Sequence, residues 1–339
     1  MQNNLDIFED KERIGKKSDE KKNIYSKYCD LIYYNSTHDP ELTLAMLVYK
    51  PEKPSYIKAA THGWHMSIKE FHPLDKPQGE YLTVQIDMRG RAFSDGSADC
   101  NGWELYDIID GIEYVKKHYK EYIIDENVVY FEAGSGGGGN AYALACKFPD
   151  YFAHITSMCG ISDYELWYKN DSIGEFRDEL DVWIGDFENK EAYASRSGIT
   201  AVENICTYMS VIHGTADLRV GIEQARGFMK KAYKTDKYNY ISYMELPGVG
   251  TREHWGNTTD EQMDSISLFP EAARKAHRVP VNIPRKGKMV ICGYLFTKDF
   301  SVVLNNIDRV AHVEYDLDRN IINVIGLNND EFTIKAYDR

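Results

Sequence analysis

Short apolar runs of strand length alternate with helix-like segments along most of the chain. The clearest helix-like segment covers residues 104–119, where apolar residues recur at helical spacing. Strands that alternate with helices predict a parallel sheet with helices on both faces, which is an α/β fold. The predicted strands of this sheet cover residues 56–63, 81–88, 128–133, 152–159, 209–214 and 240–248.

Two further apolar runs precede this pattern. Residues 27–34 and 42–51 are separated by a turn-rich stretch, so they predict an antiparallel pair at one edge of the sheet. Residues 1–23 mix acids and lysines with few apolar positions, which predicts a solvated, charged leader. We therefore assign the core of the fold to residues 24–160 and 207–280.

Residues 161–206 interrupt the alternation and combine many acidic residues with large aromatic ones, among them Trp167 and Trp183. We interpret this stretch as a lid insertion over the core. Large aromatic residues more often anchor cores than bind ligands, so packing is the simplest role for these tryptophans. Stacking on a substrate is the alternative.

The pattern changes again near the C-terminus. Residues 279–288 carry two prolines, and residues 285–339 consist of short apolar runs divided by Asn, Asp and Gly. Such runs predict a small antiparallel β appendage. The appendage carries no motif that points to a function.

The composition excludes several classes of partner. The chain has 339 residues and a formal net charge of −13, whereas binding to nucleic acid or to an anionic membrane needs a basic face. The N-terminus lacks an apolar signal core, and no run of 18 apolar residues occurs, so we expect a cytoplasmic protein that spans no membrane. The six cysteines form no CxxC pair and are expected to be reduced thiols.

A serine with glycine on both sides, Ser135, lies between the predicted strand 128–133 and a helix-like segment. A nucleophilic serine on a sharp strand-to-helix turn needs small residues two positions before and two positions after it. Ala133 and Gly137 meet this requirement. The pattern therefore predicts a nucleophile turn with Ser135 at its tip.

The same stretch also matches a dinucleotide-binding pattern, because Gly134, Gly136 and Gly139 spell GxGxxG. Such a site needs an acidic residue about 20 positions further on. The next predicted strand, 152–159, ends without one. We therefore favour the nucleophile turn.

A serine hydroxyl is a weak nucleophile near neutral pH and needs a histidine base that a carboxylate orients. In α/β hydrolases these residues follow the serine in the order Asp, then His. Asp217 comes just after the strand 209–214, and His254 lies in a glycine-rich loop after the next strand. The order predicts a catalytic triad of Ser135, Asp217 and His254.

The reaction also needs an oxyanion hole, normally built from the amide after the nucleophile and an amide after an earlier strand. Gly136 and Trp64 are the candidates. Two histidines beside Trp64, His62 and His65, are spaced three apart but have no third ligand at a matching spacing, so we expect no metal site. The candidates for the wall of the substrate pocket are Trp64, Trp167, Trp183 and Trp255.

Four segments of the chain follow one another in a characteristic order. VQIDMRGRAFSDGS is similar to a DxRGxGxSxG stretch, SGGGGNAYALACKFPDYF to an SxGGxxAxxxAxxxPxxF helix, and IHGTADLRVGIEQARGF to an HGxxDxxVxxxQxxxF segment. WIGDFENKEAYASRSGITAVENIC is similar to the linker before the last of these. Together they resemble α/β hydrolases of the prolyl oligopeptidase, acetyl xylan esterase and cocaine esterase groups. The resemblance covers residues 45–256, places Asp217 on the triad carboxylate, and departs from the pattern at Ala133, where the family usually has glycine.

The resemblance implies a serine hydrolase that works through an acyl-enzyme and needs no cofactor. We expect the substrate to be a small ester, so that the chain acts as a short-acyl carboxylesterase or a carbohydrate acetyl esterase. The alternative is a prolyl oligopeptidase-like peptidase that acts on short peptides, and a less favoured one is an inactive hydrolase-fold binding protein. The sequence leaves open whether the chain forms a homo-oligomer.

Overall fold

The computed structural model describes residues 26–68, 76–77, 79–171, 174 and 176–337. The predicted charged leader therefore lies outside the described residues. None of the helices in the described part of the chain combines the length and the apolar character that a membrane span requires.

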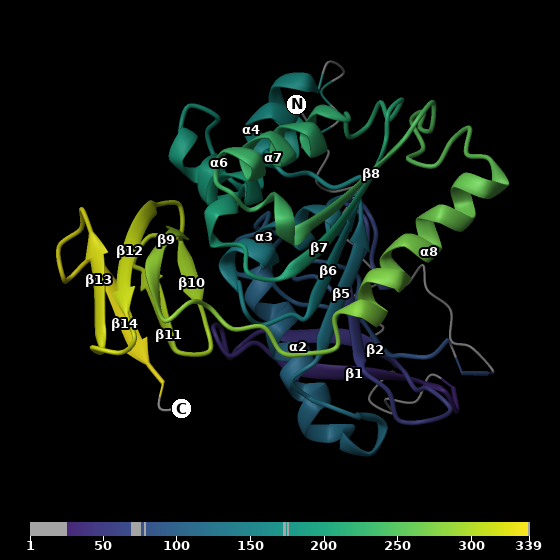
Figure 1. Ribbon diagram of the computed structural model, residues 1–339, viewed down its shortest axis with the longest axis horizontal. Helices are drawn as coiled ribbons and strands as arrows, with labels where there is room; N and C mark the ends of the chain where they lie inside the picture. Colours follow the sequence, from purple (N-terminus) through teal and green to yellow (C-terminus); the bar gives the residue numbers. More distant parts are fainter. Residues whose placement is uncertain (1–25, 69–75, 78, 172–173, 175, 338–339) are drawn as a thin grey trace.

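The core is one eight-stranded sheet with the strand order β1-β2-β4-β3-β5-β6-β7-β8 (Figure 1). β1 pairs with β2, and β2 with β4, in antiparallel fashion, whereas all later pairs are parallel. The α/β prediction and the antiparallel pair at the sheet edge are thus confirmed. The strands are β1 (Cys29–Asn35), β2 (Thr43–Tyr49), β3 (Ile57–Ala60), β4 (Leu82–Asp87), β5 (Val129–Gly134), β6 (His154–Met158), β7 (Tyr208–Gly214) and β8 (Ile241–Leu246).

Helices cover both faces of this sheet. α2 (Glu104–His118), α3 (Gly136–Lys147) and α7 (Glu223–Lys234) contribute apolar residues to the main core cluster, on one face. α8 (Asp260–Ala276) packs against β6 and β7 and closes a separate cluster. Because side chains alternate along a strand, β2 sends Met46 to the main cluster and its neighbour Leu47 to another one.

The segment between β6 and β7, for which we predicted a lid, is helical. It consists of α4 (Tyr164–Asn170), α5 (Arg177–Trp183), α6 (Lys190–Arg196) and the 3₁₀ turns of η4 (Gly198–Asn204). Its aromatic residues pack mainly against one another in a cluster of their own. This cluster lies beyond the carboxyl ends of the parallel strands, which is where ligands bind in open α/β sheets.

The C-terminal part forms a second, antiparallel sheet with the order β13-β12-β9-β10-β11-β14 (Figure 1). It has its own apolar cluster, but Val290, Cys292 and Tyr294 belong to the core of the hydrolase part. The ring of Tyr294 stacks on Trp103 at a centroid distance of 4.9 Å. The strands are β9 (Lys286–Cys292), β10 (Tyr294–Phe296), β11 (Phe300–Leu304), β12 (Val310–Asp316), β13 (Ile321–Ile325) and β14 (Phe332–Ala336).

One buried side chain, that of Asn204 in η4, links helix α3 of the core to strand β9 of the second sheet. Its Nδ2 donates to the carbonyl oxygens of Val290, at 2.7 Å, and Cys146, at 2.8 Å, and its Oδ1 accepts from the Val290 amide at 2.8 Å. The side chain thus pairs with strand β9 as a neighbouring strand would, while also satisfying the end of α3. Asn204 and the backbone groups that it bonds are buried, so the link contributes to holding the second sheet in place.

We predict that Asn204→Ala destabilises the protein by about 3 kcal/mol, because each buried backbone group left unpaired costs about 1–3 kcal/mol. Urea unfolding followed by circular dichroism measures this change. Asn323→Ala, at an exposed position of β13, serves as the control and should stay within about 0.5 kcal/mol of the wild type. Equal stabilities of the two variants would contradict the role assigned to Asn204.

Candidate active site

Ser135 occupies the turn between β5 and α3 and has an unusual backbone conformation. Its φ is +56° and its ψ is −122°, a region that residues with a side chain seldom adopt and that costs on the order of 1–3 kcal/mol. The turn is held from both sides, since the Ser135 amide donates to Met158 O at 2.8 Å and its carbonyl accepts from the Gly139 amide at 3.0 Å. Such a strained strand-to-helix turn is the backbone conformation that a nucleophile turn requires.

The glycines around Ser135 are close-packed. A Cβ on Gly137 would lie 2.7 Å from the Cβ of Ala133, and a Cβ on Gly138 would lie 2.7 Å from the Cα of Gly160. Real Cβ atoms do not approach other atoms so closely, so these positions require glycine. The glycine run therefore lets the turn pack tightly against β6 and its own strand.

Asp217 and His254 form the second part of the site. Nδ1 of His254 donates to Oδ2 of Asp217 at 2.6 Å, and this bond assigns the proton to Nδ1 and leaves Nε2 as an acceptor. The other carboxylate oxygen accepts from the amides of Arg219, at 2.9 Å, and Val220, at 3.0 Å. The loops after β7 and β8 thus bring together two residues that lie 37 positions apart in the sequence.

Burial of Asp217 raises the pKa of its carboxyl, but the hydrogen bond and charge of His254 and the Val220 amide lower it more. The net effect keeps the pKa of Asp217 below its usual value, so the carboxylate stays ionised at neutral pH. A buried carboxylate in this state orients an imidazole and stabilises its protonated form.

The hydrogen bonds of the described residues include none between the Ser135 hydroxyl and His254. In free enzymes the bond between nucleophile and base is often long and shortens when substrate binds. Cys159 lies on the other side of the pair, and its Sγ is within 4.8 Å of the ligand atoms of Asp217 and His254. Cys159, Asp217 and His254 are residue types that can bind a metal ion. Because Asp217 and His254 are hydrogen-bonded to each other, the two atoms of that bond are not available as a pair of metal ligands.

The two candidates for the oxyanion hole are in backbone contact. A Cβ on Gly136 would lie 2.8 Å from the amide nitrogen of Trp64 and 2.9 Å from its Cα. Beside them, His62 accepts from the Met88 amide through Nε2 at 3.1 Å, and its Nδ1 donates to Gly63 O at 2.9 Å. Burial, together with the charge of Arg91, lowers the pKa of His62 to about 3, so this histidine is a neutral tether for the loop.

The helical segment between β6 and β7, our predicted lid, holds the Trp64 side chain through aromatic contacts and one buried carboxylate. The indole lies 4.8 Å from the ring of Trp167 and 5.0 Å from that of Trp183, measured between centroids. Glu179 of α5 accepts from the Trp64 indole N–H and contacts Nε2 of His65 at 2.9 Å. The sequence contained no signal for Glu179, because the contact joins residues 115 positions apart.

Trp255 lies apart from the other three tryptophans that we expected to line the pocket. It packs with Ile212, Leu246 and Ile266 in the cluster beneath α8. Trp255 follows His254 directly in the loop after β8, but the two side chains contact different groups, Asp217 for His254 and the α8 cluster for Trp255. A cavity of about 510 Å³ borders Asp217 instead, between lid residues Trp167 and Phe176 and the loop residue Arg252, which is a volume typical of small-ligand sites.

Comparison with known families gives a match that covers more than half of the chain. The profile described as "Prolyl oligopeptidase family" matches residues 77–267. The chain belongs to the prolyl oligopeptidase family. This confirms the resemblance seen in the sequence and supports the prediction of a serine hydrolase. A search of curated proteins found no match.

Solved structures with a similar fold include hydrolases and peptidases. A puromycin hydrolase is 15% identical with a TM-score of 0.61, over 76% of this chain and 42% of that chain. The acylaminoacyl peptidase of Pyrococcus horikoshii is 19% identical with a TM-score of 0.58, over 74% and 42%. The puromycin-hydrolyzing peptidase of Mycobacterium tuberculosis is 15% identical with a TM-score of 0.58, over 75% and 41%. The matched part is thus less than half the length of each of these proteins.

We predict that Gly136→Ala lowers kcat by about 100-fold or more, because the new Cβ would displace the Trp64 backbone and removing one oxyanion donor costs that much. Gly227→Ala on α7 is the matched control, since its Cβ would meet only Ile199 Cδ1 at an ordinary 3.6 Å. Turnover of a p-nitrophenyl ester and the melting temperature are measured for both. If both variants keep full activity, the two backbones do not act together in catalysis.

Proposed function

We propose that this chain is a serine hydrolase that cleaves short peptides through an acyl-enzyme, with Ser135, His254 and Asp217 as its catalytic triad. The observation that carries the proposal is the combination of the strained Ser135 turn with the 2.6 Å bond between His254 and Asp217. A serine with a strained backbone also occurs in turns without catalytic function, and a His–Asp hydrogen bond by itself can be a purely structural contact. Their arrangement in one fold, in the order Ser, Asp, His, supports the triad.

In the first half of the reaction, Ser135 Oγ attacks the carbonyl carbon while Nε2 of His254 takes up the hydroxyl proton. Asp217 stabilises the imidazolium through Nδ1. The same proton then passes to the leaving amine, which breaks the scissile bond and leaves the acyl group on Ser135. Water repeats the sequence and releases the acid.

Each tetrahedral intermediate carries a negative oxygen, which we assign to the backbone amides of Gly136 and Trp64. The contact between these two segments supports the assignment. Because Glu179 and the lid tryptophans hold Trp64, the lid positions one of the two amides. The cavity of about 510 Å³ adjoins this site at Asp217, whereas neither Ser135 nor His254 is among its lining residues.

Membership of the prolyl oligopeptidase family and the peptidases among the similar structures favour peptides over esters as substrates. This reverses the preference that we drew from the sequence. Small esters are the second candidate, because the same triad and oxyanion hole serve both reactions and part of the sequence pattern resembles esterases.

We predict that a fluorophosphonate probe labels the wild type and does not label Ser135→Ala, while Asp217→Asn keeps the fold but lowers kcat by about 10⁴-fold. Labelling is followed by gel fluorescence and folding by circular dichroism. Ser157→Ala tests whether labelling is specific, since this buried serine donates to Gly138 O and lies outside the triad. A wild type that takes no label would support the inactive binding protein instead.

A substrate panel separates the two candidate reactions. Prolyl and other aminoacyl p-nitroanilides are compared with p-nitrophenyl acetate, with Ser135→Ala as the blank for each. Peptidase activity predicts turnover of at least one anilide that depends on Ser135. Turnover of the ester alone would assign the chain to the esterases.

A further inference from the structure

A second polar site adjoins the oxyanion hole, and neither the triad nor its partners explain it. Arg91 lies on the turn after β4, where the related DxRGxG pattern has an unspecified residue. Its side chain is buried, with only 8% of the residue exposed. Among the described residues, no hydrogen bond or ion pair reaches the guanidinium, and its Nε has no partner. Burying a charge in this way is costly unless something pairs with it.

The neighbouring arginine of the same turn shows the contrast. Arg89 donates to both carboxylate oxygens of Asp107, at 2.6 and 2.8 Å, which is the usual arrangement of a buried arginine. Arg91 instead lies over the face of Trp183, with its guanidinium carbon 4.9 Å from the ring centroid. The indole fixes the guanidinium plane and leaves its N–H groups without acceptors.

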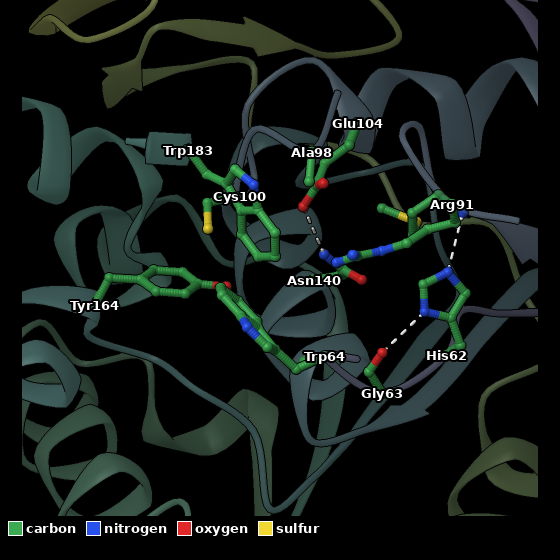
Figure 2. Close-up of a pocket in the computed structure, with 12 residues that line it drawn as sticks. His62, Gly63, Trp64, Arg91, Ala98, Cys100, Glu104, Asn140, Tyr164 and Trp183 are labelled. Atoms are coloured by element: carbon green, nitrogen blue, oxygen red, sulfur yellow. Dashed lines mark hydrogen bonds between the residues drawn. The ribbon is translucent and has the colours of Figure 1, made fainter. Parts of the chain in front are cut away.

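Arg91 points into a cavity of about 20 Å³, shown in Figure 2. This is more than the roughly 10–15 Å³ that one water molecule requires, but it is too small for a ring. Gly136 and Trp64 form part of the wall, so the cavity borders both backbone segments of the proposed oxyanion hole. A group bound in it would lie next to a carbonyl held at that hole.

Glu104 faces the same cavity from another wall (Figure 2). Its Oε1 accepts from the Asn101 amide at 2.7 Å and from Asn140 Nδ2 at 3.4 Å. In the described part of the chain, nothing donates to its Oε2. Burial, followed by the charge of Asp99, raises the pKa of Glu104, and the charge of Arg91 acts against this rise. The cavity thus offers donors on one wall and an acceptor on the other.

These two walls discriminate among polar groups. A carboxylate would satisfy Arg91 but would be repelled by Glu104, and an ammonium group would meet the reverse conflict. An amide presents a carbonyl oxygen and N–H donors on one small planar group, so it satisfies both walls without adding charge. We propose that this cavity binds an amide group of the substrate, with its carbonyl oxygen on Arg91 and its N–H on Glu104.

The substrate can supply this amide in two ways, as a side-chain carboxamide such as that of glutamine or as the next peptide unit. The kinetic test of this amide site depends on the proposed hydrolase function. The amide site also has a binding test that does not need turnover.

The kinetic test compares kcat/KM for glutaminyl, glutamyl and norleucyl p-nitroanilides, together with alanyl p-nitroanilide before and after N-acetylation. We expect kcat/KM of the substrate that carries the amide to exceed kcat/KM of its counterpart by on the order of 10- to 100-fold. A hydrogen bond to a charged group stabilises binding by a free energy that corresponds to this factor. The glutaminyl/norleucyl ratio reports the side chain, and the acetylated/free alanyl ratio reports the peptide unit.

In Arg91→Met the ratio that is high in the wild type should fall to about one, and Glu104→Gln should reduce it. Arg226→Met is the control, because Arg226 is an exposed arginine of α7 that pairs with Glu245, and its ratio should match the wild type. Arg91→Met and Arg226→Met are first compared in melting temperature, so that a loss of fold is separated from a loss of selectivity.

The binding test uses Ser135→Ala and titration calorimetry with glutaminyl-alanine, norleucyl-alanine and N-acetyl-alanyl-alanine. If the wild type takes the fluorophosphonate label but all ratios are near one, the amide site is refuted and the hydrolase stands. If the wild type takes no label but the amide ligands bind more tightly, the site stands without the proposed reaction. A preference for the glutamyl substrate in the kinetic test would mean that the cavity is a carboxylate site. Equal binding of all three ligands in calorimetry would mean that the cavity is filled only by water.

Discussion

The site depends on one backbone constraint, which is the close approach of chain segments around Ser135. The serine adopts φ +56° because β5 must turn directly into α3, and that turn exists only where no Cβ separates its segments. Gly137 and Gly138 bring it against Ala133 and Gly160, and Gly136 brings it against Trp64. The same glycines therefore permit the strained backbone of Ser135 and the close approach of the Trp64 loop. The packing of this turn thus fixes both groups relative to each other.

The lid is part of this arrangement. Glu179 holds both Trp64 and His65, and the lid aromatics enclose the Trp64 ring. The loop that carries the proposed oxyanion amide is thereby fixed by a side chain on another element, in the manner of preorganised sites. The C-terminal sheet is joined to the opposite part of the core through Asn204 and Tyr294, so it contributes to the body that supports α3.

The elements whose patterns are local were predictable. Alternating apolar runs revealed the parallel strands and the amphipathic helix 104–119, and the order of Ser135, Asp217 and His254 led to the triad that we propose. Contacts that join distant segments were not predictable. Glu179, Arg91 and Glu104 look like ordinary charged residues in the sequence, and only the fold shows that all three are buried beside the oxyanion loop. Trp255 was grouped with the lid tryptophans by residue type, yet the chain turns its side chain toward α8.

The sequence by itself determined the α/β class, and it predicted a nucleophile turn and the order of a triad, because periodicity, glycine and motif spacing are properties of short stretches of chain. Tertiary structure alone decided how His254 meets Asp217, which tryptophans surround the oxyanion loop and which arginine of one turn is paired. These contacts depend on distances across the fold. A buried charge needs a partner that pairs or hydrogen-bonds with it, whereas water can solvate an exposed one. Arg89 found Asp107, whereas Arg91 was left facing a cavity.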